Sequence, residues 1–149
     1  MTKIKVKIKK LRDNAVVPEY QTSGSAACDL VSCGDVVIPA RGRAMVPTGI
    51  SVECEGVAVL LFARSGLAVK KGISLANGVG VVDSDYRGEI MVGLMNNTDE
   101  DYAVSEGDRV AQMMFVPVVQ AVFEEASELS DTDRGAGKLG RGCEVKVGL

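Results

Sequence analysis

The most reactive combination of side chains lies in a polar segment between two apolar runs. Residues 77–89 read Asn-Gly-Val-Gly-Val-Val-Asp-Ser-Asp-Tyr-Arg-Gly-Glu, and a strictly alternating run follows. This pattern predicts a β-hairpin whose tip presents Asp83, Asp85, Tyr86 and Arg87. Turns are usually built from Gly, Asn, Asp and Ser, so an aromatic ring and a base indicate a further role. Such a tip suits a nucleobase held against its backbone and a carboxylate aimed at a phosphate ester.

The chain has no histidine, which narrows the chemistry that it can perform. Ser-His-Asp and Cys-His nucleophile systems, histidine-ligated zinc and histidine general bases are excluded. The four cysteines form no Cys-x-x-Cys pair, so zinc-ribbon and thioredoxin-like sites are excluded as well. A general base must therefore be a carboxylate, Tyr, Cys or Lys.

Four other segments carry polar groups that suit a phosphate or a cation. They are residues 26–30, 63–66, 107–112 and 134–142. In the second of these, Ser65 is predicted to be the N-cap of a short helix that ends at Gly72 in the C′ position. The unpaired N–H groups at the start of this helix, beside Arg64, are expected to form an anion site.

Short apolar runs separated by turn residues recur along the chain. They predict an all-β protein, either a barrel or a jelly-roll-like sandwich, and 149 residues suffice for one domain with a real core. The expected strands are 3–9, 27–31, 35–38, 43–47, 49–54, 57–62, 79–82, 89–96, 102–104, 109–116 and 118–123.

Charge and composition restrict the partners of the protein. The net charge of −3, from 17 basic and 20 acidic residues, argues against the broad basic face that nucleic acid or a membrane surface requires. No stretch reads as a secretory or transmembrane segment, and residues 3–9 alternate Lys with Ile and Val as an edge strand would. We therefore expect a cytoplasmic protein with no direct nucleic-acid or membrane partner.

The last quarter of the chain differs from the rest. Residues 124–133 are acidic and rich in Ser, and residues 134–142 combine glycine with Arg and Lys. A segment of this composition cannot bury enough apolar surface to stay ordered alone. We expect a β-domain over 1–123 and a mobile arm over 124–149 that becomes ordered when its N–H groups and cations wrap a phosphate.

Taken together, the polar segment 77–89 and the four other segments closely resemble, in order and spacing, the five motifs of the trimeric dUTPase family. The resemblance extends from about residue 22 to residue 142. It implies a distorted jelly-roll-like β-barrel with one short helix and a flexible Gly-rich C-terminal arm. It also implies a homotrimer that hydrolyses dUTP to dUMP and pyrophosphate with Mg²⁺, each active site drawing motifs from different subunits.

The resemblance assigns roles to the residues of the central segment. Asp83 matches the catalytic carboxylate that activates water for attack on the α-phosphorus, and Tyr86 matches the ring that packs on the deoxyribose. The backbone from Asn77 through Val81 and Val82 matches the uracil-reading strand, and Met91 matches a position lining that pocket. As structural alternatives, Asp83 would cap its own turn, Tyr86 would make a cross-strand pair and Met91 would fill the core.

The flanking motifs match the groups that meet the triphosphate. Arg64, Ser65 and Gly66 match the phosphate-binding motif, and Gln112 matches an amide near the α-phosphate and the attacking water. Asp29 matches the residue that holds magnesium through water, which a single outer-sphere carboxylate can do. The alternatives are a helix cap for Ser65 and a buried turn residue for Asp29. Asp108 and Arg109 are expected to form a structural ion pair.

The fifth motif departs from the family pattern. Arg134, Gly135, Gly137 and Gly140 fit it, whereas Lys138 replaces Gly, Leu139 replaces Phe, and Arg141-Gly142-Cys143 replaces Ser-Thr-Gly. Leu139 would cover the base without aromatic stacking, and Arg141 would meet the γ-phosphate by charge. The expected enzyme closes its lid more weakly, so Leu139→Phe should lower KM.

Two other functions compete with dUTP hydrolysis. A dCTP deaminase of related fold would need donors arranged for cytosine and would release ammonia from dCTP. A non-catalytic dUTP-binding regulatory protein would bind the nucleotide without turnover, and the altered arm keeps this alternative open.

Overall fold

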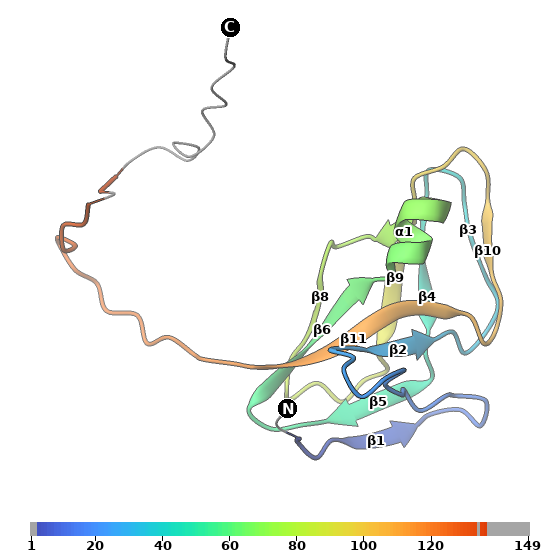
Figure 1. The fold of residues 1–149 in the computed structure, drawn as a ribbon, viewed down its shortest axis with the longest axis horizontal. Coiled ribbons are helices and arrows are strands. Elements are labelled where there is room, and N and C mark those ends of the chain that lie inside the picture. The colour runs from blue at the N-terminus through green and yellow to red at the C-terminus, as the bar shows by residue number, and fades with distance from the viewer. Residues whose placement is uncertain (1–2, 134, 137–149) are drawn as a thin grey trace, which may run out of the picture. The chain divides into compact units, whose positions relative to one another are not determined.

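The computed structural model describes residues 3–133, 135 and 136, in two compact units that divide after Val119. The first unit holds all the regular elements described here, and Figure 1 shows them as strands with one short helix. The strands are β1 (Lys7–Lys10), β2 (Cys28–Val31), β3 (Val36–Ile38), β4 (Arg43–Pro47), β5 (Ile50–Glu53), β6 (Val57–Ala63), β7 (Ile73–Leu75), β8 (Gly80–Val82), β9 (Met91–Asn96), β10 (Tyr102–Val104) and β11 (Arg109–Pro117). The all-β class is therefore confirmed.

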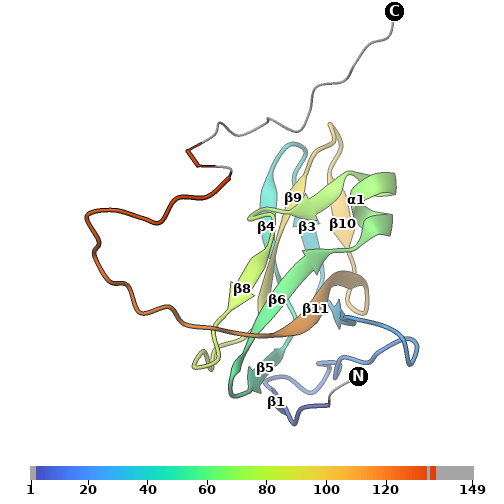
Figure 2. The ribbon, with the colours of Figure 1, turned by 60° about the vertical axis from the view of Figure 1, so that its left-hand side comes forward.

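The largest sheet has the strand order β2-β11-β6-β8, with antiparallel pairing throughout. Its two faces follow the period of two along β6, where Val57, Val59 and Leu61 are buried in the core. Leu60 and Phe62 alternate with them on the opposite face and are half-buried. This sheet joins three of the motif segments, because β2, β11 and the end of β6 lie side by side (Figure 2).

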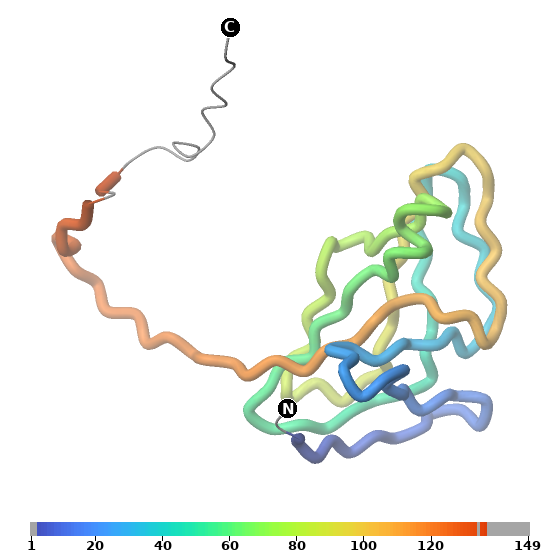
Figure 3. Tube along the Cα trace, in the orientation of Figure 1, coloured from blue at the N-terminus to red at the C-terminus, as the bar shows by residue number. Residues whose placement is uncertain are grey.

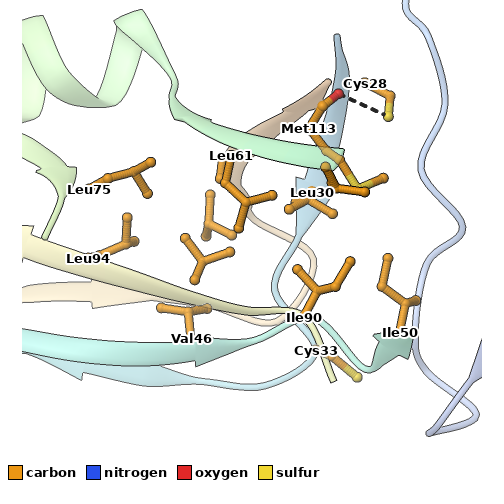
Figure 4. Packing of buried hydrophobic residues seen from close by; sticks show 14 of the residues in the cluster. Cys28, Leu30, Cys33, Val46, Ile50, Leu61, Leu75, Ile90, Leu94 and Met113 are labelled. Atoms are coloured by element: carbon orange, nitrogen blue, oxygen red, sulfur yellow. Dashed lines mark hydrogen bonds between the residues drawn. The ribbon is translucent and has the colours of Figure 1, made fainter. Parts of the chain in front are cut away.

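A second sheet, β4-β9-β7, contributes the other wall of the core. Its buried residues Val46, Val92 and Leu94 face Leu61 and Leu30 of the first sheet, as Figure 4 shows for those it labels. Two-stranded sheets, β1-β5 and β10-β3, complete the unit. Strand pairing among the described residues does not close into a continuous barrel, so the architecture is jelly-roll-like without full closure.

Helix α1 (Ser65–Lys71) follows β6 directly. It ends at Gly72, whose φ of 67° is left-handed and whose N–H donates to the carbonyl of Leu67. The predicted stop at Gly72 is confirmed. The predicted N-cap is wrong: Arg64 is the capping residue, in extended conformation and with no side-chain cap hydrogen bond, so Ser65 already belongs to the helix.

The predicted hairpin over residues 79–96 is also wrong. β8 pairs with β6, whereas β9 pairs with β4 and β7 in the other sheet. Figure 3 lets the reader follow the chain from β8 through the connection into β9. The intervening residues 83–90 are too many for a tight turn, and the connection crosses between the sheets instead of reversing within one.

Two further strand predictions differ from the structure. The stretch 118–123, which was expected to be a strand, has no regular structure, since no described strand pairs with it. β7, which is only three residues long, was not predicted because the preceding helix and following turn mask its short pattern. Predicted strand 3–9 is shorter than expected and pairs only with β5 among the described strands, so its edge position is confirmed.

Candidate active site

Three of the segments whose polar groups suit a phosphate or a cation, 26–30, 63–66 and 107–112, converge at one end of the large sheet. Asp29 of β2 and Gln112 of β11 are paired residues across the two strands, and Gln112 is also opposite Phe62 of β6. Paired residues share a face, so Asp29 and Gln112 project on the face away from the main core. Arg64 follows β6 by one residue and reaches the same place.

Asp29 is a buried carboxylate held between two guanidinium groups. Its side chain is 6% exposed, its Oδ1 accepts from Arg64 Nε at 3.2 Å, and its Oδ2 accepts from Arg109 Nη1 at 3.1 Å. Gln112 Nε2 lies 3.5 Å from Oδ1. A charge this deeply buried has to be paired, because desolvation alone costs several kcal/mol. The cluster keeps a net positive charge, which suits an anionic ligand.

A β-bulge places Arg109 in this cluster. Arg109 pairs with Val31 and Ala111 pairs with Leu30, so the register shifts by one residue at Val110. In a regular strand, Arg109 and Ala111 would share a face, but the extra residue turns the Arg109 side chain to the face that carries Asp29. The expected Asp108–Arg109 ion pair is therefore wrong: the Asp108 carboxylate instead accepts from the backbone N–H of Ser105 at 2.9 Å.

The start of α1 presents its first two residues to solvent. Ser65 and Gly66 are exposed, and an added Cβ at Gly66 would meet nothing within 4 Å. The hydroxyl of Ser65 and the first helical N–H groups are thus open to a ligand next to Arg64. Arg64 and Arg109 also line a cavity of about 260 Å³, together with residues of α1, β10 and the turn before β11.

A second cavity lies beside the Gln112 side chain. Its volume is about 380 Å³, and residues of the loop before β2 close one side. The sheet lines the other side with Phe62, Gln112 and Met114, all on the face away from the core. Gln112 is the polar group that the sheet contributes to a predominantly apolar wall.

Asp83 is the first residue after β8 and is exposed to solvent. Its carbonyl accepts from the N–H of Tyr86 at 3.1 Å, which closes a turn, while the hydrogen bonds among the described residues leave its carboxylate uninvolved. The side chain is thus not the cap of its own turn. A solvent-exposed carboxylate that no described side chain or N–H group pairs with is positioned to accept a proton from water.

Tyr86 is folded back onto the same turn. Its hydroxyl donates to the carbonyl of Glu89 at 3.1 Å, and the side chain is half exposed. Gly88 makes room for the ring, because an added Cβ would lie 2.5 Å from Tyr86 Cζ. Sequence reasoning missed this role of Gly88, although a glycine two residues after an aromatic residue was a usable signal.

The far end of this turn is anchored in the core. Ile90 is 1% exposed, its N–H donates to the carbonyl of Ile50, and its carbonyl accepts from the Thr48 hydroxyl at 2.6 Å. The Glu89 carboxylate accepts from the N–H of Gly49 at 2.8 Å. Residues 83–90 are therefore held at one end by β8 and at the other by hydrogen bonds to the start of β5 and the residues just before it.

The remaining residues of the expected uracil site line the approach to this turn. Asn77 is exposed in the turn before β8, and Val81 is 62% exposed on the outer face of the sheet. Val82 points inward and packs against the core. Met91 is half-buried opposite Pro47 at the start of β9.

The expected site residues form two separate groups within one chain. Val82, the neighbour of Asp83, pairs with Val59 near the start of β6, whereas Arg64 follows its end. Five residues of strand correspond to about 16 Å. One group holds Asp29, Arg64 and Gln112 with the start of α1, and the other holds Asp83 with Tyr86.

The buried thiols are unsuited to nucleophilic chemistry. Burial raises the pKa of Cys28, and the negative charge of Asp29 raises it further. Burial also raises the pKa of Cys54. Because the thiolate is the reactive form, these groups are poor nucleophiles near neutral pH. Within the described residues, the carboxylate of Asp83 is the better candidate for a general base.

The oxygen-bearing side chains of the described residues can be compared with the ligands that magnesium requires. No cluster of three or more Cys, Asp or Glu side chains that could hold a metal occurs in the described part of the chain. Asp29 offers one carboxylate: its Oδ1 accepts from Arg64 and Gln112, its Oδ2 accepts from Arg109, and a lone pair therefore remains on Oδ2. This set fits a hydrated ion whose main ligands are the phosphates of a substrate, and it does not fit a resident protein-bound metal.

Four expected site residues, Arg134, Leu139, Gly140 and Arg141, lie outside the described residues. Of the neighbouring residues, Gly135 has a φ of 47° and its N–H donates to the carbonyl of Thr132. None of the helices in the described chain is long and apolar enough to cross a membrane.

Comparison with known proteins identifies the family. The dUTPase family model matches residues 13–143. Deoxyuridine 5'-triphosphate nucleotidohydrolases are similar in sequence: that of Nautilia profundicola is 48% identical, covering 92% of this chain and 97% of the relative, and that of Desulfitobacterium hafniense is 46% identical, covering 94% and 97%. The enzyme of Oryza sativa is 46% identical over 91% of this chain and 78% of its own length.

Solved structures support the same fold. The dUTPase of Staphylococcus bacteriophage 80alpha, solved with dUpNHpp, superimposes with a TM-score of 0.86 at 23% identity, covering 93% of this chain and 98% of that one. A dUTPase from phage phi11 of S. aureus, described with a structural Mg(II) ion, gives a TM-score of 0.79 at 24% identity, covering 84% and 98%. Because the family model and the relatives span nearly the whole sequence, this chain belongs to the dUTPase family.

Proposed function

We propose that the protein hydrolyses dUTP to dUMP and pyrophosphate, with Asp83 as the general base. In this reaction Asp83 orients a water and takes up its proton as the water oxygen attacks the α-phosphorus. The P–O bond to the β-phosphate then breaks and pyrophosphate leaves. The observation that carries the proposal is an exposed Asp83 carboxylate, without a partner among the described residues, on an anchored turn in a chain whose family match covers residues 13–143.

The uracil and the deoxyribose are proposed to lie against the turn and strand β8. Backbone groups from Asn77 to Val82 would pair with O4 and N3–H of uracil, which cytosine cannot match. Each unpaired buried polar group costs about 1–3 kcal/mol, so two mismatches give discrimination of about 10²–10⁴. The Tyr86 ring, held against Gly88, would leave no room for a 2′-hydroxyl. Met91 would close the side of the pocket.

The triphosphate is proposed to meet the other group of residues. The guanidinium of Arg64, the hydroxyl of Ser65 and the N–H of Gly66 would bind phosphate oxygens, and the Gln112 amide would lie near the α-phosphate. From the arm, Arg134 and Gly140 would contact phosphate, Arg141 would meet the γ-phosphate and Leu139 would cover the base.

We propose that the reaction requires Mg²⁺, which membership of the family supports, and that Asp29 contacts the hydration shell of the ion. When bound, Mg²⁺ neutralises charge on the phosphate oxygens and fixes their orientation. The protein itself supplies the base, the cations and the shape of the pocket. Support comes from the lone pair that remains on Asp29 Oδ2, which accepts from Arg109 alone among the described residues.

We propose a homotrimer in which each active site takes its two groups of residues from different chains. The separation of Asp83 from Arg64, about 16 Å along β6, supports this assembly, because one α-phosphate must meet both groups. The outer face of the large sheet supports it as well. Leu60, Met114 and Val81 form one apolar row there, and Val81 is 62% exposed.

The test is incubation of the protein with Mg²⁺ and each deoxynucleoside triphosphate in turn. Pyrophosphate from dUTP alone is the expected result. Ammonia from dCTP would establish a deaminase instead. Tight binding of a non-hydrolysable dUTP analogue without turnover of dUTP would establish a regulatory binding protein.

A further inference from the structure

The guanidinium of Arg64 is fixed by two acceptors, the Asp29 carboxylate on β2 and a backbone carbonyl on β11. Its Nε donates to Asp29 Oδ1 at 3.2 Å, and its Nη1 donates to the backbone carbonyl of Arg109 at 3.1 Å. A guanidinium carries five N–H donors in a rigid plane, so two such contacts set its orientation and leave the other donors for a ligand.

The side chain of Arg109 secures the opposite oxygen of the same carboxylate. Its Nη1 donates to Asp29 Oδ2 at 3.1 Å, so Asp29 cannot rotate without breaking one of two charge-assisted hydrogen bonds. The bulge at Val110 is what brings Arg109 to this face. The three side chains form a continuous clamp, Arg109–Asp29–Arg64, which joins three of the motif segments through side-chain contacts.

We propose that Asp29 and Arg109 are positioning residues that hold Arg64 in the orientation required to bind substrate phosphate. The inference deepens the proposed function and rests on it, because Arg64 needs this orientation only if it meets the triphosphate. It assigns Arg109 a functional role. It also gives Asp29 a task that is independent of the metal.

Arg109 is the residue that separates this role from metal binding. Contact between Asp29 and a hydrated ion through water requires no arginine on Oδ2, whereas the clamp does. The Arg109 side chain is 49% exposed, so a shorter polar side chain can be accommodated without opening the core. A charge-preserving change at the same position, Arg109→Lys, can still donate to Oδ2 and serves as the rescue variant.

The experiment measures dUTP hydrolysis and ligand binding for Arg109→Gln, Arg109→Lys, Asp29→Asn and Arg64→Ala. Arg109→Gln is expected to lower kcat/KM about tenfold, mainly through KM, because a misplaced contact weakens phosphate binding. Arg109→Lys should stay within about threefold of the wild type. In the Arg64→Ala background, Arg109→Gln should cause less than about a twofold further loss, because interacting residues are non-additive.

Two readouts separate the clamp from a metal effect or a loss of folding. Calorimetric binding of a non-hydrolysable dUTP analogue in EDTA should weaken about tenfold for Arg109→Gln. The Mg²⁺ concentration for half-maximal activity should be unchanged for Arg109→Gln, whereas Asp29→Asn should raise it because Asp29 is also proposed to contact the hydrated ion. Arg41→Gln is the matched control, because it removes a bidentate arginine–carboxylate pair with Asp99 away from this cluster, and it should behave as the wild type.

The outcomes are distinct. Absence of dUTP hydrolysis by the wild-type protein would reject the proposed function. The clamp would be overturned if the wild-type protein hydrolyses dUTP and Arg109→Gln is equally active. Arg109→Gln would in that case also bind the dUTP analogue in EDTA as tightly as the wild type does. A raised Mg²⁺ requirement in Arg109→Gln, combined with additive effects of Arg109→Gln and Arg64→Ala, would also overturn it in favour of a metal role alone.

Discussion

At the scale of single residues, the turn after β8 holds its reactive groups by local contacts. Tyr86 is fixed by its hydrogen bond to the Glu89 carbonyl and by the space that Gly88 leaves. The carboxylate of Glu89 is itself bonded to Gly49 in the strand connection that precedes β5. The orientation of the ring therefore depends on a glycine that has no functional group of its own.

Gly88→Ala should reduce the preference for dUTP over UTP. The added Cβ would lie 2.5 Å from Tyr86 Cζ, so the ring must move away from the sugar position. Because one methylene in a pocket changes discrimination by about 10–200-fold, we expect the ratio of kcat/KM for dUTP and UTP to fall at least about tenfold. The measurement is pyrophosphate release from each nucleotide. Gly34→Ala, where the nearest atom is 3.9 Å away, is the control, and an unchanged ratio in Gly88→Ala would refute the positioning role.

The thiols provide a second prediction at this scale. Raised pKa values leave less thiolate for Cys28 and Cys54 at pH 8 than for a free cysteine, so both should be alkylated slowly by iodoacetamide in the folded protein. Mass spectrometry of the labelled peptides reports the rates. Labelling as fast as in the urea-unfolded protein would contradict the burial described here.

The polar residues of the turn could be predicted from sequence, because acid, ring and base at a turn are unusual for structure alone. The pairing of Asp29 with Arg109 could not be predicted from sequence. Regular alternation would place Arg109 on the core side with Ala111, and only the bulge at Val110 reverses this. No residue type in 107–112 marks a bulge, since the shift arises from pairing with β2, which is distant in sequence.

At the scale of elements, helix α1 shows how a short segment with a weak helical pattern is defined by its ends. It has seven residues, none of which is fully buried, and Leu67 packs partly against the core. Gly72 supplies the left-handed residue at its C-terminus, and its position against Thr98 leaves no room for a side chain.

Gly72→Ala should destabilise the protein by about 1–2 kcal/mol, because alanine at a φ of 67° is strained and its Cβ would lie 2.7 Å from Thr98 Cγ2. Gly66→Ala is the matched substitution in the same helix, in open space, and should stabilise by up to about 1 kcal/mol. Urea unfolding of both variants gives the comparison. Equal stability of the two would show that Gly72 is not a required cap.

Strand positions followed from the period of two, but strand partners did not. β8 and β9 are consecutive and apolar, and sequence proximity favoured a hairpin. In the structure they belong to different sheets: Leu61 and Val59 of β6 pair with β8, whereas Val46 of β4 pairs with β9. Local patterns carry no information on which of several similar strands will be the neighbour.

At the scale of the whole molecule, the outer face of the large sheet is the feature that a single chain does not explain. Leu60, Met114 and Val81 lie in one cross-strand row on the side away from the core. Apolar rows of this kind mark interaction surfaces. The two groups of site residues lie at opposite ends of β6. A second copy of the chain on this face would cover the apolar row and would also bring together the two groups from different chains.

Leu60→Glu should therefore dissociate the assembly and abolish most dUTP hydrolysis, because it places a charge in the apolar row. Light scattering after size exclusion should give about three times the chain mass of 15.7 kDa for the wild type and the mass of one chain for the variant. Val37→Glu, on the β3-β10 sheet at a residue 58% exposed, is the control. A monomeric wild type with full activity would reject the shared site.

The central claim is that the Asp83 carboxylate activates the attacking water. The most direct measurement is single-turnover hydrolysis of dUTP by Asp83→Asn, paired with calorimetric binding of a non-hydrolysable dUTP analogue. We expect a rate about 10²–10⁴-fold below that of the wild type, because the amide cannot accept the proton, with analogue affinity changed by less than about threefold. An Asp83→Asn protein that cleaves dUTP at the wild-type rate would contradict it.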